Sequence, residues 1–136
     1  MQNNDPKEET TEFKGRRVLV TGGTRGIGEA IVNRLVRGGG DVVATARSVS
    51  PETAADRFVQ ADISTQDGIE SVAKAVTDRF KGLDILIHNV GGSAAYGGGA
   101  LALFDDDWQR AFDTNLFAAV RLDRAFLPSM WHMAPA

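Results

Sequence analysis

The chain has 136 residues, 43% of them hydrophobic and 24% charged, which is the composition of one soluble globular domain. Its 15 basic and 18 acidic residues give a net charge of -3, which excludes a broad electrostatic attraction to nucleic acid or to an anionic membrane surface. The sequence has no cysteine, two widely separated histidines and no apolar run long enough to span a bilayer. We therefore expect a cytoplasmic protein with no metal site, and with neither nucleic acid nor a membrane among its partners.

The first third of the chain predicts a tail followed by a strand, a helix and a second strand. Residues 1–13 are mostly polar and lack apolar periodicity, which predicts a flexible tail. Arg17–Thr21 is a short β-branched run that stops at two glycines, as a buried strand does where it enters a turn. Apolar residues then recur at four-residue spacing over Ile27–Leu35 before three glycines, which predicts an amphipathic helix, and Val42–Ala46 predicts the second strand.

The middle of the chain continues this alternation. Arg57–Ala61 predicts a third strand, and a helix with apolar residues at helical spacing is expected from Ser64 or Thr65 to Gly82. Leu83–Asn89 is almost continuously apolar, which is typical of a strand in a sheet covered on both faces. Because strands alternate with helices, we expect a parallel sheet, followed by a glycine-rich mobile loop over residues 91–99.

The last predicted helix carries a polar residue on its apolar face. At 100° per residue one stripe contains the apolar residues Trp108, Phe112, Ala119, Leu122 and Phe126. Asn115 lies on the same stripe, and an unpartnered buried amide would cost roughly 1–3 kcal/mol. Asn115 therefore either serves a function or is satisfied by a neighbouring backbone carbonyl.

The segment TGGTRGIG follows the first predicted strand and opens the first predicted helix. In that position glycines allow a tight turn, a close approach of backbone N–H groups to a pyrophosphate, and close packing of helix on strand, while the helix dipole favours the anion. An ordinary glycine turn is the alternative. The context favours dinucleotide binding, and the residues expected to contact the cofactor are Thr21, Gly22, Thr24, Arg25, Gly26, Ile27 and Gly28.

Two arginines bear on the choice of cofactor. Arg47 ends the second predicted strand, about 20 residues beyond the glycines, where an acidic residue would favour NAD(H). Arg47 and the turn residue Arg25 supply two guanidinium groups, which suit a dianionic 2′-phosphate. The alternative is that Arg47 is a solvated surface charge. The sequence favours NADP(H) over NAD(H).

Several motifs in order resemble the short-chain dehydrogenase/reductase family, from about Lys14 to Met130. The glycine turn resembles the family's Thr-Gly-x-x-x-Gly-x-Gly motif, and the pair Asp62-Ile63 resembles its adenine-contacting position, although Asp62 could also be a strand-end cap. The stretch Asn89-Val90-Gly91-Gly92 resembles the family's Asn-Asn-Ala-Gly motif, with His88 in place of the first asparagine. The resemblance implies cofactor contacts by Asp62, Ile63, Asn89, Val90 and Gly91.

The same resemblance implies a fold and a set of domain limits. We expect an α/β fold with a Rossmann-type, doubly wound parallel sheet of strand order 3-2-1-4, truncated after about four strands. Residues 14–130 would form an incomplete dinucleotide-binding domain, and residues 131–136 no longer resemble the family. The edge of the fourth strand would then lie open, which favours self-association unless a loop or a partner covers it.

Catalysis in this family uses a serine, a tyrosine and a lysine four residues after the tyrosine. The one tyrosine here is Tyr96, and four residues later stands Ala100. Asn115-Leu116 resembles the family's helical Asn-Leu, whose amide helps to hold a water and the catalytic lysine, so Asn115 is the one expected catalytic residue that is present. We expect an NADP(H)-binding oxidoreductase of alcohol or carbonyl substrates by descent, whose present chain lacks efficient catalysis. The alternatives are a nonfunctional remnant and a non-catalytic NADP-binding module or subunit.

Overall fold

The computed structural model describes residues 10–49, 57–93 and 97–133 of the chain. The elements, in chain order, are β1 (Arg17–Thr21), α1 (Gly26–Arg37), β2 (Asp41–Ala46), β3 (Phe58–Gln60), α2 (Gln66–Phe80), β4 (Ile85–Ile87), a 3-10 turn η2 (Ala100–Ala102), α3 (Asp105–Phe112), a π-helical turn η3 (Asp113–Phe117) and α4 (Ala118–Met133).

The four described strands form one parallel sheet in the order β3-β2-β1-β4, which confirms the α/β class and the predicted strand order. β3 and β4 are shorter than the runs expected from the sequence. β4 ends at Ile87 because the next backbone groups turn away from strand pairing: the N–H groups of Asn89 and Val90 donate to the hydroxyl of Thr21, at 3.0 and 3.2 Å.

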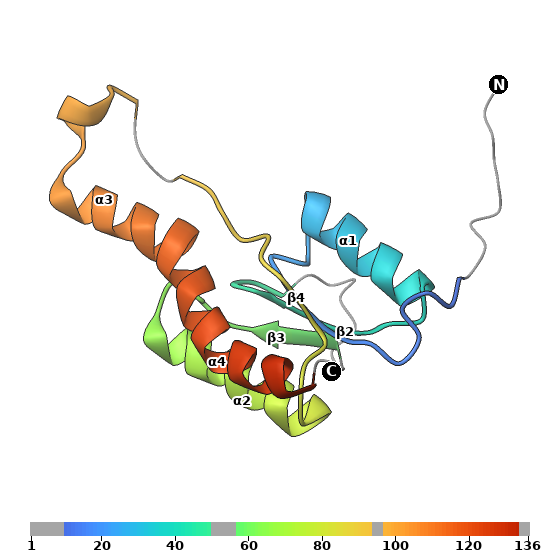
Figure 1. The fold of residues 1–136 in the computed structure, drawn as a ribbon. Helices are drawn as coiled ribbons and strands as arrows, with labels where there is room; N and C mark the ends of the chain where they lie inside the picture. Colours follow the sequence, from blue (N-terminus) through green and yellow to red (C-terminus); the bar gives the residue numbers. More distant parts are fainter. Residues whose placement is uncertain (1–9, 50–56, 94–96, 134–136) are drawn as a thin grey trace, which may run out of the picture.

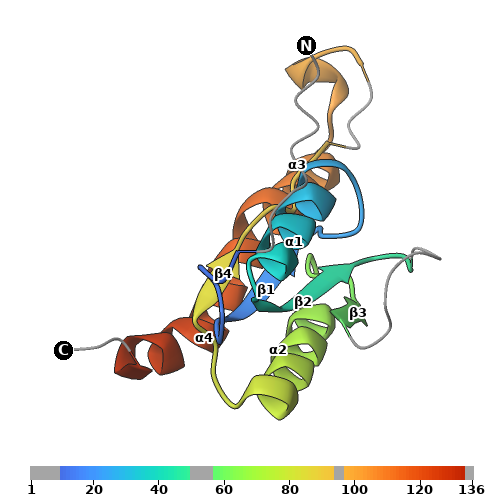
Figure 2. The same cartoon turned by 90° about the vertical axis from the view of Figure 1, so that its right-hand side faces the viewer.

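Helices cover the two faces of the sheet unequally. α1 lies on one face, and α2 and α4 lie side by side on the other (Figures 1 and 2). The larger core cluster lies between the sheet and the α2–α4 pair, and its buried residues include Leu19, Val43, Ile63, Val72, Val76 and Leu122. Beneath α1 the buried cluster consists of Val18, Val20, Leu35 and Val42. The α1 face is therefore the thinner one.

An ion pair between Arg17 and Asp84 joins the starts of β1 and β4, at the end of the sheet opposite to the glycine turn. Arg17 Nε and Nη2 each donate to one oxygen of Asp84 at 2.9 Å, and the backbone N–H of Arg17 donates to Asp84 Oδ2 at 2.8 Å. These bonds favour the ionised carboxylate, so the hydrogen bonds from Arg17 lower the pKa of Asp84 from 3.8 to about 2. The pair fixes where β1 and β4 begin.

Glu12 and Phe13, which fall within the expected tail, contact the fold. The backbone N–H of Phe13 donates to the carbonyl of Gly38 at 2.8 Å, and the Phe13 ring packs beside the cluster under α1. Glu12 forms an ion pair with Arg34 of α1. Apolar contact and charge pairing thus attach these two residues to α1, whereas residues 1–9 lie outside the described part of the chain.

The C-terminal helix differs from the single inward stripe expected from the sequence. The π turn η3 joins α3 to α4, and α3 projects away from the sheet (Figure 1). Trp108 and Phe112 are consequently 46% and 48% exposed, and Asn115 is exposed as well. On α4 the buried stripe consists of Ala118, Leu122 and Phe126, with Ala118 in the place expected for Ala119.

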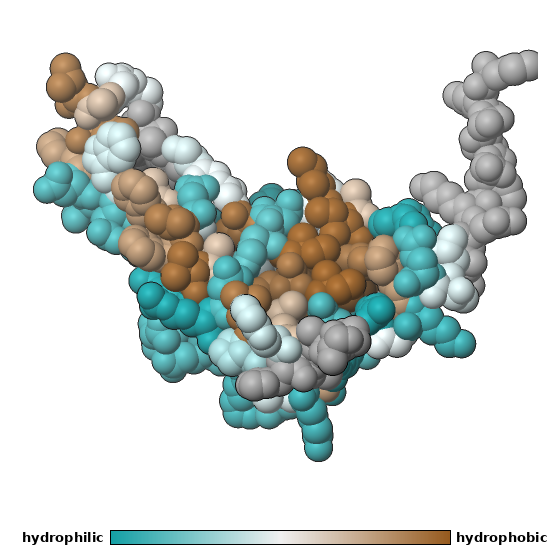
Figure 3. Space-filling model, in the orientation of Figure 1, coloured by the Kyte–Doolittle hydropathy of each residue, from teal (hydrophilic) through white to brown (hydrophobic). Residues whose placement is uncertain are grey.

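Figure 3 shows apolar side chains gathered over α1 and the adjoining part of the sheet, and a second apolar band along α3 and the start of α4. In the second band, large exposed apolar residues include Phe104, Trp108, Phe112 and Leu116. Among the helices described, none is both long and apolar enough to cross a membrane.

Candidate functional site

The candidate site is built on the tight turn between β1 and α1. Gly22 and Gly26 have positive φ angles of 67° and 55°, a region that side chains other than glycine rarely adopt. The N–H of Gly22 donates to the carbonyl of Thr45 at 2.8 Å, which attaches the turn to the end of β2. Glycine at these positions is therefore required by backbone conformation.

Close packing of Gly28 and Gly23 against neighbouring atoms also holds this turn in place. A Cβ atom on Gly28 would lie 1.8 Å from the carbonyl oxygen of Gly22 and 2.5 Å from Asn89 Nδ2. A Cβ on Gly23 would lie 2.6 Å from the Cβ of Ala44, so Gly23 brings α1 close to β2. Close packing of helix on strand was expected of this glycine segment, but Gly23 was not among the residues singled out, although the run of two glycines after β1 was the available signal.

The first turn of α1 presents backbone N–H groups without an intrahelical acceptor, as every helix start does. Its N-cap residue, Arg25, forms no side-chain capping hydrogen bond. Ile27 is 75% exposed, so the expectation that it belongs to the buried face of α1 is wrong. The side chain of Ile27 instead lies on the surface beside the free N–H groups, with Thr24 half-buried before it.

Thr21 belongs to the framework of the site and not to its surface. The residue is 0% exposed, and its hydroxyl donates to the carbonyl of Ile87 at 3.4 Å while accepting from the N–H groups of Asn89 and Val90. Burial and full use of the hydroxyl leave it nothing to offer a ligand, contrary to the expected direct contact. Thr21 holds the end of β4 against the end of β1.

The residues after β4 lie against the glycine turn. Asn89 Nδ2 donates to the carbonyl of Gly22 at 3.1 Å, Val90 is half-buried beside the core, and Gly91 is exposed. His88, which stands where the family has asparagine, is paired with Asp123 of α4 through Nε2 at 2.7 Å. Asn89 and Val90 thus lie against the glycine turn, whereas the near neighbour of Gly91 is Asn115 Oδ1. Contact of these residues with a cofactor stays a prediction.

The two arginines lie at the same edge of the sheet. Arg25 follows the end of β1 and Arg47 follows the end of the adjacent parallel strand β2, whose Thr45 pairs with Thr21. Both side chains are exposed. Within residues 10–49, 57–93 and 97–133, neither guanidinium has a hydrogen-bond or ion-pair partner, although Gln60 Nε2 donates to the backbone carbonyl of Arg47 at 3.0 Å.

Asp62 and Ile63 follow β3 at that same edge. Asp62 Oδ1 accepts from the N–H of Ser64 at 3.0 Å and from its hydroxyl at 2.6 Å, which is the local cap that the sequence left open as an alternative. Ile63 is only 5% exposed and packs into the larger core cluster, so its side chain cannot reach a ligand at the surface. Of the two side chains, that of Asp62 is exposed and can reach a ligand at the surface.

Asn115 lies inside the π turn and contacts the loop after β4. Its Oδ1 accepts from the N–H of Gly92 at 2.9 Å, and its Nδ2 donates to the carbonyls of Gly92 at 2.8 Å and Ala111 at 2.9 Å. Backbone groups therefore satisfy the amide, as the alternative interpretation held, and Gly92 is a partner that the sequence argument missed. Tyr96 lies outside the described residues.

Comparison with known proteins agrees with this geometry. The family model for short chain dehydrogenases matches residues 16–135. The 3-oxoacyl-[acyl-carrier-protein] reductase FabG of Vibrio cholerae is 34% identical over 125 residues, covering 87% of this chain and 50% of that protein. The corresponding Escherichia coli reductase is 31% identical, with the same coverage. The chain spans about half the length of these curated relatives.

Solved structures show the same likeness. The L-sorbose reductase of Gluconobacter frateurii, complexed with NADPH and L-sorbose, has a TM-score of 0.77 and 28% identity, with 88% of this chain and 49% of that chain covered. The NADH-dependent reductase A1-R′, complexed with NAD, has a TM-score of 0.79 and 29% identity, with 88% and 53% covered.

Proposed function

Because the chain belongs to the short-chain dehydrogenase family, we propose that it binds NADP(H) at the glycine turn after β1. The observation that carries this proposal is the turn itself: no side chain of the N-cap residue caps the first N–H groups of α1, glycines form the turn before them, and a close-packed framework holds the turn in place. A pyrophosphate is the ligand that this geometry suits.

The preference for NADP(H) rests on charge. Arg25 and Arg47 are exposed at the same sheet edge, and neither is neutralised by another described group. Each guanidinium that bonds a 2′-phosphate contributes about 1.5–3 kcal/mol, the size of a hydrogen bond to a charged group. Structural relatives carry NADPH in one case and NAD in another, so the two arginines, and not the family, support this choice.

The remaining assigned residues divide between the two ends of the cofactor. We assign the pyrophosphate to Gly22, Gly26 and the N–H groups up to Gly28, and the adenine to Asp62. The nicotinamide end is assigned to the Ile27 side chain, to Asn89 and Gly91, and to the loop that Asn115 holds.

For chemistry, we propose an oxidoreductase acting on alcohol or carbonyl groups, the activity class named for the reductases that this chain resembles. Residues 1–136 contain one tyrosine, Tyr96, with Ala100 and not lysine four residues later. A phenol has an ordinary pKa of about 10, and without a cation such as that lysine beside it a phenol is a poor proton donor near neutral pH. We therefore expect this chain by itself to bind cofactor without transferring hydride at rates usual for such enzymes.

Calorimetric titration of the chain with NADPH and with NADH tests the binding proposal. We expect NADPH to bind at least tenfold more tightly than NADH at low salt, because only NADPH carries the 2′-phosphate. Equal dissociation constants would contradict the NADP(H) preference. Absence of binding by a folded, monodisperse chain would contradict nucleotide binding and favour the remnant.

Incubation of the chain with NADPH and a panel of ketones and aldehydes tests the catalytic proposal. We expect no consumption of NADPH above the rate without protein, followed at 340 nm. Steady turnover by the purified chain would contradict it.

A partner surface is proposed at β4. β4 is an edge strand of the described sheet, and its Ile85, Leu86 and Ile87 are all half-buried. An apolar strand with free backbone groups along one side favours pairing with a second copy of the same strand. Sedimentation velocity would show a concentration-dependent dimer that Ile87→Lys abolishes, whereas a monomer at all concentrations would contradict the pairing.

A further inference from the structure

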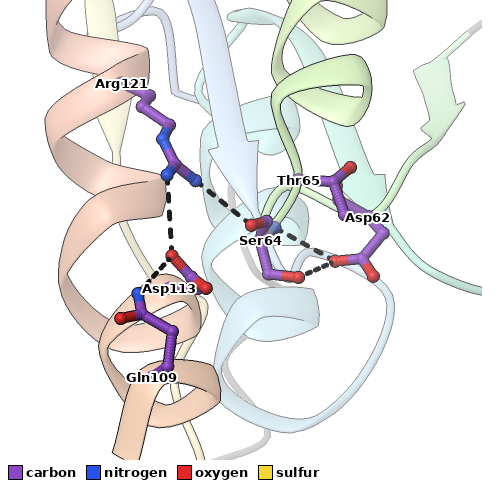
Figure 4. Close-up of polar contacts among 6 residues, drawn as sticks. All are labelled: Asp62, Ser64, Thr65, Gln109, Asp113 and Arg121. Atoms are coloured by element: carbon purple, nitrogen blue, oxygen red, sulfur yellow. Dashed lines mark hydrogen bonds and ion pairs between the residues drawn. The ribbon is translucent and has the colours of Figure 1, made fainter. Parts of the chain in front are cut away.

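A partly buried arginine, Arg121, connects the two ends of the candidate cofactor site, the loop that contains Asp62 and the π turn that contains Asn115. Arg121 lies in the first turns of α4, and its side chain reaches the loop between β3 and α2 (Figure 4). Arg121 Nη1 donates to the backbone carbonyl of Ser64 at 3.2 Å, and Nη2 lies 3.5 Å from Asp113 Oδ1 in the π turn. The side chain is 28% exposed and lies over the ring of Phe117.

Each end of this connection belongs to the candidate site. On one side Ser64 donates both its N–H and its hydroxyl to Asp62 Oδ1, so the position of Ser64 decides where the Asp62 carboxylate lies. On the other side Asp113 also accepts from Gln109 Nε2 at 3.3 Å, and the same π turn contains Asn115, which holds Gly92. Within the described part of the chain, the hydrogen bond and the ion pair that connect the Asp62 loop (residues 61–65) with the π turn both involve Arg121.

Arg121 holds the one peptide group between two residues that are fixed by other contacts. The side chain of Ile63 is anchored in the core beside Ala118 and Leu122 of α4, and Thr65 caps the start of α2 by accepting from the N–H of Gly68 at 3.1 Å. Between these two anchors the carbonyl of Ser64 is held by Arg121. Loss of Arg121 would free that peptide group and, with it, the ligand of Asp62 Oδ1.

We propose that Arg121 is a positioning residue: it sets the orientation of the Asp62 carboxylate toward the adenine amino group and holds that loop in register with the π turn. This proposal rests on the proposed nucleotide function. An ionised carboxylate accepts a hydrogen bond from the exocyclic amino group of adenine, whereas the carbonyl that replaces this group in hypoxanthine repels it. Preference for adenine over hypoxanthine therefore reports how Asp62 is oriented.

The test compares the dissociation constants of NADPH and of its hypoxanthine analogue. We expect the unsubstituted chain to prefer NADPH by about tenfold, the size of one charge-assisted hydrogen bond, and Asp62→Asn to remove most of that preference. Arg121→Met should reduce it to about twofold or less, and Arg121→Lys, which keeps the charge but not the fork, should fall between. Arg124→Met is the matched control, because Arg124 lies on the same helix, is exposed and has no partner among the described residues.

A double-mutant cycle identifies the path. Asp113→Asn should reduce the adenine preference in the native background and have no further effect in Arg121→Met, because Asp113 acts through Arg121. Hydrogen exchange of the nucleotide-free chain should quicken at residues 62–65 and 113–117 together in Arg121→Met, and in neither segment in Arg124→Met.

The outcomes separate the two proposals. A general loosening of the fold would weaken NADPH and its hypoxanthine analogue alike, so an unchanged preference in a folded Arg121→Met chain overturns the positioning role and leaves nucleotide binding intact. No binding of NADPH by the unsubstituted chain overturns both proposals. Exchange that is unchanged in both segments also overturns the positioning role, even if Arg121→Met cannot be titrated.

Discussion

Two parts of the candidate cofactor site, the glycine turn and the contact between Gly92 and Asn115, are held by different kinds of interaction. At the glycine turn, backbone is packed against backbone so closely that Gly28 has no room for a methyl group, and the buried Thr21 hydroxyl joins β1 to the segment after β4. At the second of these, exposed Gly92 is attached to the exposed side chain of Asn115 on a helix that leaves the sheet. Packing makes the glycine turn rigid, whereas exposed hydrogen bonds leave the contact between Gly92 and Asn115 able to open at low cost.

Gly28→Ala should give the largest loss of stability, and it tests directly whether the glycine turn is close-packed. The added Cβ meets the carbonyl of Gly22 at 1.8 Å, so α1 or the turn must move. We expect a loss of about 3 kcal/mol in the free energy of unfolding, at the upper end for overpacking. Urea denaturation measures it against Gly97→Ala, where a Cβ would meet nothing within 4 Å. Equal stability of the two variants would show that the turn is not close-packed.

Acid should remove the pair at the opposite end of the sheet. The pKa of Asp84 is about 2 in the folded chain and near 3.8 unfolded, so its contribution is present above pH 3.8 and is lost as the pH falls toward 2. The shift corresponds to about 2 kcal/mol, since each unit is worth about 1.4 kcal/mol. Asp84→Asn should lose this amount at pH 7 and show a flatter stability profile below pH 4, measured by urea denaturation at each pH. A parallel loss in both proteins down to pH 2 would contradict the pairing.

Asn115→Ala should have the smallest effect on stability, and it tests whether the Gly92 contact opens independently of the glycine turn. Because the amide is exposed, we expect a loss below about 1 kcal/mol, since water replaces its bonds. The amide of Gly92 should nevertheless exchange its hydrogen about tenfold faster, while the amides of Gly22 and Gly23 stay unchanged. Asn33→Ala, an exposed change on α1, is the control. Faster exchange at Gly22 would mean that the glycine turn and the Gly92 contact open together.

Sequence patterns predicted the features that depend on neighbouring residues. Strand order and the glycine turn follow from alternating apolar runs and from glycines at a strand end, and both are found as expected. The prediction that Asn115 and Trp108 are buried was wrong, because helical periodicity cannot reveal a π turn or show that a helix extends past its sheet. The bond from Arg121 to Ser64 joins residues 57 apart, and no local pattern indicates it.

Selection of NADP(H) by the glycine turn and by Arg25 and Arg47, whose guanidinium groups have no partner among the described residues, is the core of the proposed function. Its most direct test is the ratio of NADH to NADPH dissociation constants in the double variant Arg25→Gln/Arg47→Gln, with Arg37→Gln, at the far end of α1, as control. We predict that the ratio falls from at least tenfold to about one because NADPH binds more weakly while NADH is unchanged. A ratio that stays as high as in the control would contradict the account.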